Sequence, residues 1–226
     1  YLHPPDDQKA GVDQVCTLGY GTSRALSAFS VYARLDPEGP FREAARRLAE
    51  GIKRTLIIDG PNAYMFGHWM VPGKKIEKPG EPPLGIMAGG NAWTAQSLIQ
   101  YHRALGDPEA LELAGKILHY IMIDSGYFLE DGTFQQNAGG SPWAHFHTHA
   151  MGILATLYYI EETGDRALLD IALKAYEYGI RAGNGVVGFF PEATHNDGAE
   201  FRSDEHPYKY HTSEICEVVD MIICAI

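Results

Sequence analysis

Cysteine is scarce in this sequence, which has three among its 226 residues: Cys16, Cys216 and Cys224. The count is odd, and the last two are separated by about 12 Å along a helix, which is beyond the reach of a disulfide bond. The sequence therefore indicates no disulfide framework.

Long apolar runs and basic clusters are missing as well. No stretch of about 18 uncharged apolar residues occurs, so we expect no membrane span. Acidic residues outnumber basic ones by 29 to 18, and the formal charge is −11. Binding to nucleic acid depends on clustered Lys and Arg, so this balance disfavours a nucleic-acid partner. We expect a soluble protein, and the sequence does not decide between the cytoplasm and the periplasm.

What the sequence does contain is a repeat. An apolar helix, a short turn, an amphipathic helix and a long loop rich in Gly and aromatic residues follow one another three times. We predict inner helices that begin near Thr22, Asn91, His145 and Thr212, and outer helices that begin near Phe41, Pro108 and Arg166.

The two kinds of helix differ in their polar pattern. From Ala167 to Arg181 polar residues recur at steps of 4, 3 and 4, which is typical of a helix with one wet face. From Ala150 to Ile160 the helix is apolar on nearly all sides, as expected of a helix inside a ring of others. The sequence therefore predicts an all-α fold, an α/α toroid of helical hairpins.

The length of the chain limits how much of such a ring it can form. A closed toroid of six hairpins needs on the order of 350 residues at this repeat length. We therefore predict that residues 1–226 form a single α/α-toroid catalytic domain that is partial. Its other half either lies in further chain or is supplied by a partner, which includes a homo-oligomer.

The long loops, at about 59–90, 126–143 and 183–211, all follow an outer helix and precede an inner one. They should gather at one end of the ring, over the positive N-termini of the inner helices. Aromatic rings beside polar groups suit sugar recognition, because a ring can stack on the apolar face of a sugar. The predicted substrate-binding residues are Trp143, His147, His149, His195, Tyr208 and His211.

Three groups of residues are candidates for chemistry. The first is His145, His147 and His149, of which the outer two have the i, i+4 spacing of paired metal ligands on a helix. These histidines could instead bind substrate hydroxyls, or only cap the helix and satisfy buried groups.

The second group is the loop at 189–201, where Glu192, Asp197 and Glu200 lie close in sequence. Neighbouring carboxyl groups allow one to act as a general acid while another stays ionised, as glycoside cleavage requires. The alternative for each carboxylate is an ordinary solvated turn.

The third group is Glu214, Glu217 and Asp220, which form a carboxylate stripe on an otherwise apolar C-terminal helix. Burying unpaired carboxylates is costly, so they should face a cleft, a metal or hydrogen-bond donors, unless they belong to a structural ion-pair network. Glu214 and Cys216 could ligate zinc, although a buried cysteine more often acts as a small apolar residue.

The order of several motifs resembles a known family. His145-Phe-His-Thr-His149, the turn Tyr159-Ile-Glu-Glu-Thr-Gly-Asp165, Gly198-Ala-Glu-Phe201 and Glu214-Ile-Cys216 are similar to segments of the β-L-arabinofuranosidase family of glycoside hydrolases, family 127, and its six-hairpin relatives. The resemblance covers about the last eighty residues. It implies that His145 binds substrate, that Glu200 is the acid/base, and that Glu214 and Cys216 bind zinc.

These observations predict a carbohydrate-active enzyme, a glycoside hydrolase that cleaves a glycosidic bond of a plant or microbial glycan. Its catalytic residues would be Glu200, Glu214 and His145, with zinc as the one cofactor suggested. A polysaccharide lyase acting on a uronate-containing glycan is the first alternative, and a sugar epimerase using two histidines is another. The non-enzyme alternative is a helical-repeat scaffold, which the long loops disfavour.

Overall fold

The computed structural model describes residues 2–3, 16–65, 69–70, 86–135, 143–184, 188–195 and 215–226. Its α-helices are α1 (Gly19–Leu35), α2 (Phe41–Thr55), α3 (Ile86–Leu105), α4 (Pro108–His119), α5 (Phe146–Thr163), α6 (Leu169–Ala182) and α7 (Ile215–Ala225). A π-helical turn, η1 (Tyr120–Asp124), continues α4.

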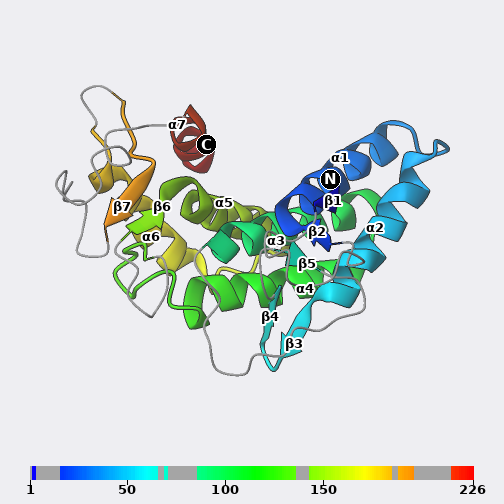
Figure 1. Cartoon of the computed structure of the whole chain (residues 1–226), viewed down its shortest axis with the longest axis horizontal. Coiled ribbons are helices and arrows are strands. Elements are labelled where there is room, and N and C mark those ends of the chain that lie inside the picture. The colour runs from blue at the N-terminus through cyan, green and yellow to red at the C-terminus, as the bar shows by residue number, and fades with distance from the viewer. Residues whose placement is uncertain are drawn as a thin grey trace.

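The helices form two layers of an open arc (Figure 1). Helices α1, α3, α5 and α7 pack one after another along the inside, and α2, α4 and α6 each pack against the inner helix that precedes them. The arc is open between α7 and α1 (Figure 1). The predicted all-α fold with inner and outer helices is confirmed, with helix starts displaced by a few residues.

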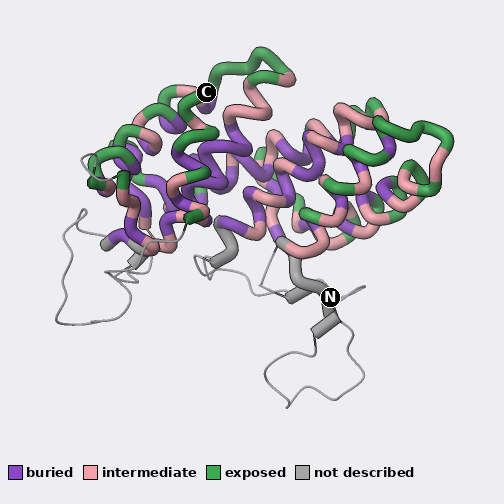
Figure 2. The backbone as a smooth tube through the Cα atoms, turned by 90° about the horizontal axis from the view of Figure 1, so that it is seen from above, coloured by how far each residue is buried: buried purple, intermediate pink, exposed green. Residues whose placement is uncertain are grey.

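Burial separates the two layers in the way that the polar pattern predicted. Residues 148–156 of α5 are all buried, because α3, α6 and α7 surround this helix. Leu98 and Ile99 of α3 and Ile117 of α4 are also fully buried. Figure 2 colours the buried residues purple along the helices. Outer helix α2 buries Ala45, Ala49 and Ile52 at helical spacing.

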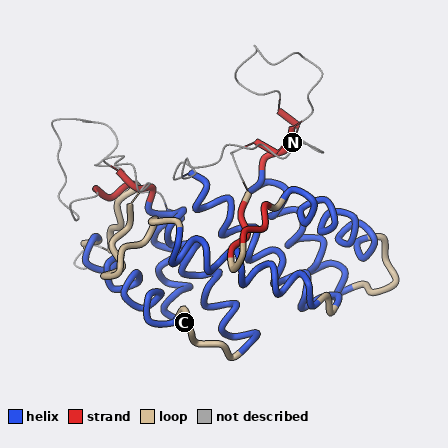
Figure 3. Tube along the Cα trace, turned by 90° about the horizontal axis from the view of Figure 1, so that it is seen from below, coloured by secondary structure: helices blue, strands red, loops and turns tan. Residues whose placement is uncertain are grey.

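Short antiparallel strands, which the sequence analysis did not predict, lie among the connections. They form a sheet β1 (Leu2–His3), β2 (Cys16–Leu18) and β5 (Trp69–Met70), a hairpin β3 (Ile57–Asp59) and β4 (Asn62–Tyr64), and a pair β6 (Trp143–His145) and β7 (Ala193–His195). Strand β2 runs directly into α1 and β6 directly into α5 (Figure 3). These strands therefore fix where two inner helices begin.

The helix ends follow local rules. Asp107 caps α4 by accepting a hydrogen bond from the Ala110 N–H at 3.2 Å, and Pro108 occupies the first turn, as the sequence predicted. Helix α5 ends at Gly164, whose φ of 71° lies in the left-handed region. No helix among the described residues is long and apolar enough to cross a membrane.

We expect Gly164→Ala to destabilise the fold by about 1 kcal/mol, because alanine is strained at this positive φ. No heavy atom lies within 4 Å of the Cβ that alanine would add, so the cost isolates backbone strain. Gly51→Ala, in the middle of α2 and also without a steric contact, is the matched control. It should stabilise the protein by about 0.5–1 kcal/mol, because alanine favours the helix. Urea unfolding measures the stability of both variants, and a loss of stability in both would contradict this explanation.

Candidate functional site

The loop end of α5 is held by the β6–β7 pair. Trp143 lies opposite His195 and His145 opposite Ala193 in the strand register, and the Phe146 N–H donates to the Glu192 carbonyl oxygen at 2.9 Å. Two loops that are far apart in sequence therefore meet at the first turn of α5. The register makes Trp143 and His195, both predicted substrate-binding residues, backbone neighbours.

His147, the second residue of α5, contacts Asp220 of α7. Its Nδ1 forms a short hydrogen bond with the Asp220 Oδ2, and the two side chains are 13% and 8% exposed. A carboxylate accepts hydrogen bonds but cannot donate one, so the proton lies on Nδ1. In the neutral ring Nε2 then keeps its lone pair and can accept a proton.

Two more side chains extend this pair across the inner layer. The Trp93 ring of α3 lies 5.2 Å from the His147 ring between centroids, and the Arg24 Cζ of α1 lies 5.0 Å from the Trp93 ring centroid. We call Arg24, Trp93, His147 and Asp220 the inner-helix row. Each of its members lies within the first eight residues of its helix. The His145 ring lies next to the row, 6.0 Å from the His147 ring.

His149 is an internal residue, which contradicts the prediction that it contacts substrate or pairs with His145 at a metal. It has no exposed surface, and its ring stacks on Phe134 at 5.1 Å and meets Tyr127 and Phe128 edge-on. Its Nδ1 lies 2.7 Å from the His145 carbonyl oxygen, and its Nε2 3.1 Å from the Gln135 carbonyl oxygen. His145 lies at the N-cap of α5 with an extended backbone, so the predicted i, i+4 helix face is not formed.

Burial also sets the charge of this histidine. Desolvation lowers the pKa of His149 to about 4, and the hydrogen bonds to the two backbone carbonyls oppose this shift only in part. The ring is therefore neutral at pH 7 and carries one N–H, so it donates to only one of the two carbonyls.

Two residues of the predicted carboxylate stripe lie among the described residues, and both are directed inward. Glu217 has no exposed surface, and Asp220 is buried against His147. The sequence analysis expected carboxylates here to meet hydrogen-bond donors, and Asp220 does so. Cys216 lies in the first turn of α7 and is partly buried.

Four predicted site residues lie outside the described residues: Glu200, Tyr208, His211 and Glu214. Their roles stay predictions, and so does the zinc site, because Glu214 is one of its two suggested ligands. Trp93 and Arg24 were not among the predicted site residues, and Asp220 was named only as part of the carboxylate stripe. Trp93 lies in a helix whose pattern indicates only burial, so no local signal distinguished it.

A cation-binding cluster elsewhere is already filled by a side chain. Glu50, Asp107 and Glu109 bring their oxygens within 4.8 Å of one another, and Lys53 Nζ lies 2.7 Å from Asp107 and 2.6 Å from Glu109. Burial acts to lower the pKa of Lys53, but the hydrogen bonds to these carboxylates outweigh it and raise the pKa. The cluster is an ion-pair network that joins α2 to α4.

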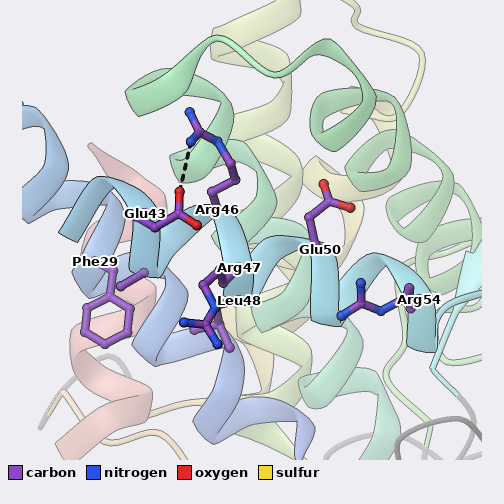
Figure 4. A pocket seen from close by; sticks show the side chains of 8 residues that line it. Phe29, Glu43, Arg46, Arg47, Leu48, Glu50 and Arg54 are labelled. Carbon is purple, nitrogen blue, oxygen red and sulfur yellow. Dashed lines mark hydrogen bonds and ion pairs between the residues drawn. The ribbon is translucent and has the colours of Figure 1, made fainter. Parts of the chain in front are cut away.

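A surface pocket on α2 is also a poor candidate for a substrate site. It is lined by Phe29, Glu43, Ala44, Arg46, Arg47, Leu48, Glu50 and Arg54. Figure 4 shows that the labelled side chains of α2 point in several directions, with Phe29 reaching the pocket from α1. Arg46 pairs with Glu43 at 3.0 Å. The pocket lies on the outer layer, whereas the inner-helix row lies on the inner one.

No protein-family model and no curated protein sequence matches the chain. Several solved structures, however, match it in fold. A family 76 α-mannanase from Bacteroides thetaiotaomicron matches with a TM-score of 0.66 and 18% identity, over 83% of this chain and 50% of that one. A cellobiose 2-epimerase from Bacillus thermoamylovorans matches with a TM-score of 0.62 and 18% identity, over 81% and 49%. An enzyme from Paenibacillus barcinonensis, complexed with xylose, matches with a TM-score of 0.54 and 17% identity, over 84% and 51%.

These similarities concern the fold. At identities near 18% they show an α/α toroid architecture and do not single out family 127. The chain spans about half the length of each matched structure, which agrees with the prediction of a partial toroid. In its architecture, this chain corresponds to about half of an α/α toroid of the six-hairpin glycosidase type, a fold found in glycoside hydrolases and sugar epimerases.

Proposed function

We propose that this chain carries the sugar-binding and catalytic end of a carbohydrate-active enzyme, and that glycoside hydrolysis is its reaction. The inner-helix row supports this proposal more than any other observation. It brings an aromatic ring, an imidazole and a carboxylate together at the end of the arc where the inner helices begin. Sugars are bound by this combination, because the ring offers an apolar face and the polar groups bind hydroxyls.

In this proposal the bond is cleaved by carboxyl groups. Glu200, the predicted acid/base, donates the proton to the leaving oxygen, and we assign Glu214, also among the predicted catalytic residues, as its ionised partner. His145 and His147 bind hydroxyls of the sugar. Trp143 and His195, whose backbones are opposite each other in the β6–β7 register, keep their predicted role in binding substrate. Tyr208 and His211 complete the predicted set.

Sugar epimerisation is the second candidate, and the His147–Asp220 pair favours it. Asp220 fixes the His147 proton on Nδ1, which leaves Nε2 free to act as a base beside a sugar carbonyl. The His145 ring, 6.0 Å away, can return the proton. A polysaccharide lyase would need a Tyr or His base and a cation, for which the sequence offers Arg202, His206, Tyr208 and Tyr210, and these lie outside the described residues.

Product analysis distinguishes these reactions. Purified protein is incubated with α-mannan, xylo-oligosaccharides, cellobiose and polygalacturonate. Hydrolysis produces new reducing ends, epimerisation changes the NMR spectrum of the sugar without cleavage, and a lyase produces a conjugated unsaturated uronate that absorbs ultraviolet light. Reducing ends are the expected result. The absence of all three products would contradict the proposed enzyme class for these substrates.

Binding provides a test that does not depend on turnover. We expect Trp93→Ala to weaken sugar binding by about tenfold or more, because the side chain loses its stacking surface. Tyr176→Ala on the outer helix α6 is the control and should bind normally. Isothermal titration measures both affinities, and equal affinity for Trp93→Ala and the parent would remove Trp93 from the site.

A further inference from the structure

His149 lies between two backbone segments at the start of α5. Its Nδ1 lies 2.7 Å from the carbonyl oxygen of His145, and its Nε2 lies 3.1 Å from the carbonyl oxygen of Gln135. His145 is the N-cap of α5, and Gln135 belongs to the segment that follows η1. The buried imidazole therefore connects this segment to the first turn of α5.

The His149 ring is itself held in place by aromatic side chains. Phe134 stacks on it with an interplanar angle of 19°, and Tyr127 and Phe128 meet it nearly edge-on. All three belong to the segment 127–134, whose ends are joined by a hydrogen bond of 2.9 Å from the Gln135 N–H to the Tyr127 carbonyl oxygen. A side chain that is locked by packing in this way can hold a neighbouring group in a fixed position.

The nitrogen atoms of His149 are not needed to fill this space. A phenylalanine ring would pack on Phe134 without burying polar atoms, which costs free energy unless they are hydrogen-bonded. The neutral imidazole has one N–H to donate. A proton on Nδ1 turns the closer contact, to His145, into a hydrogen bond, whereas a proton on Nε2 leaves two lone pairs facing each other at 2.7 Å. The geometry therefore favours the His145 carbonyl as the acceptor.

The peptide group that accepts this contact carries part of the proposed site. His145 is the last residue of β6, and its carbonyl oxygen also accepts from the Thr148 hydroxyl at 2.8 Å. The His145 ring lies 6.0 Å from the ring of His147, which pairs with Asp220. A shift of the N-cap therefore moves His145 relative to His147, and a misplacement of about 1 Å can cost about 10²-fold in rate.

We propose that His149 carries its proton on Nδ1 and acts as a positioning residue, which fixes the N-cap of α5 and so keeps the His145 and His147 rings in their relative orientation. This role rests on the proposed function, because it concerns the two histidines assigned to the sugar. His149 is fully buried and acts only through the His145 peptide group.

Three variants separate the two contacts of His149. His149→Phe keeps an aromatic ring and loses both contacts. In His149→Asn the amide reaches about as far as Nδ1 and can donate to the His145 carbonyl, whereas the longer amide of His149→Gln reaches toward the Gln135 carbonyl. Nitrogen-15 NMR of the His145 and His147 rings reports their surroundings in each variant. We expect the ring signals to move in His149→Phe and His149→Gln and to return toward the parent in His149→Asn.

Two results of the NMR measurement would overturn the proposal. Unchanged ring signals in His149→Phe would show that the contact does not position either histidine. Recovery in His149→Gln without recovery in His149→Asn would show that the Gln135 contact is the one that matters.

Kinetics show whether the link matters for the reaction. On a sugar that the parent converts, we expect His149→Phe to lower kcat by about tenfold or more with a smaller change in KM. Ile52→Ala, which opens a cavity on the buried face of α2, is the control for lost stability and should keep the parent kcat. An equal loss of kcat in Ile52→Ala would assign the effect to stability and overturn the positioning role.

The two readouts keep this proposal separate from the proposed function. If the parent converts no sugar, the proposed function fails, and moved ring signals in His149→Phe still support the link between His149 and the N-cap. If the ring signals move and kcat stays at the parent value in an active protein, the positioning role is overturned while the proposed function stands.

Discussion

Asp220→Asn is expected to lower turnover by about 10²–10⁴-fold on any sugar that the chain converts with His147. The carboxylate holds the His147 proton on Nδ1, whereas an amide can donate to Nδ1 and so favour the other tautomer. Nε2 would then carry the proton and could no longer accept one. Because the shape of the side chain is kept, we expect folding and KM to change little.

The measurement combines kinetics with spectroscopy. Values of kcat and KM are compared for the parent and Asp220→Asn, and nitrogen-15 NMR of the His147 ring reports the tautomer. Asp170→Asn is the control, because this exposed carboxylate on α6 pairs only with Lys174 of the same helix among the described residues. An unchanged kcat together with an unchanged tautomer would remove Asp220 from the mechanism.

Glu200→Gln separates the two candidate reactions. If Glu200 is the general acid/base of a hydrolase, this change removes the transferable proton and stops release of reducing ends while binding is kept. If the chain is an epimerase that uses His147, Glu200→Gln should leave conversion largely intact and Asp220→Asn should abolish it. The two variants therefore have opposite outcomes under the two candidate functions.

Lowering the pH from 7 to 4 is expected to cost about 3 kcal/mol of folding stability through His149 alone. Its pKa is about 4 in the folded protein, against an ordinary value of 6.5 for histidine. The unfolded chain therefore binds a proton first as the pH falls. The contribution is fully present above pH 6.5 and is lost progressively between pH 6.5 and 4.

Urea unfolding at a series of pH values between 7 and 4 gives the free energy of unfolding, and the slope of this free energy against pH measures the effect. His149→Phe keeps an aromatic ring against Phe134. Its slope should correspond to about one fewer proton taken up on unfolding over that interval, whatever the stability at pH 7. His119→Gln, at the partly exposed end of α4, is the control and should keep the parent slope. An identical slope in His149→Phe and the parent would contradict the assignment of the loss to His149.

The sequence by itself determined the two layers of this protein and the order of its helices. A helix returns to the same face every 3.6 residues, so the polar steps of α6 and the apolar run of α5 report the burial of each helix. Helix caps are equally local, because Asp107 and Pro108 act on the backbone within one turn. These features need no knowledge of what lies across the fold.

The tertiary structure decided which side chains meet. His147 and Asp220 are 73 residues apart, and Trp93 reaches His147 from another helix, so no spacing along the chain predicted the inner-helix row. Spacing placed His145 and His149 on one face but could not show that His145 is the N-cap of α5 and that His149 lies in an aromatic core. In the same way, α7 is apolar over most of its surface in sequence, and only its packing on α5 and α6 turned the carboxylates inward and the isoleucines outward. Local geometry sets the periodicity of a helix, whereas the neighbours that pack against it determine what each face contacts.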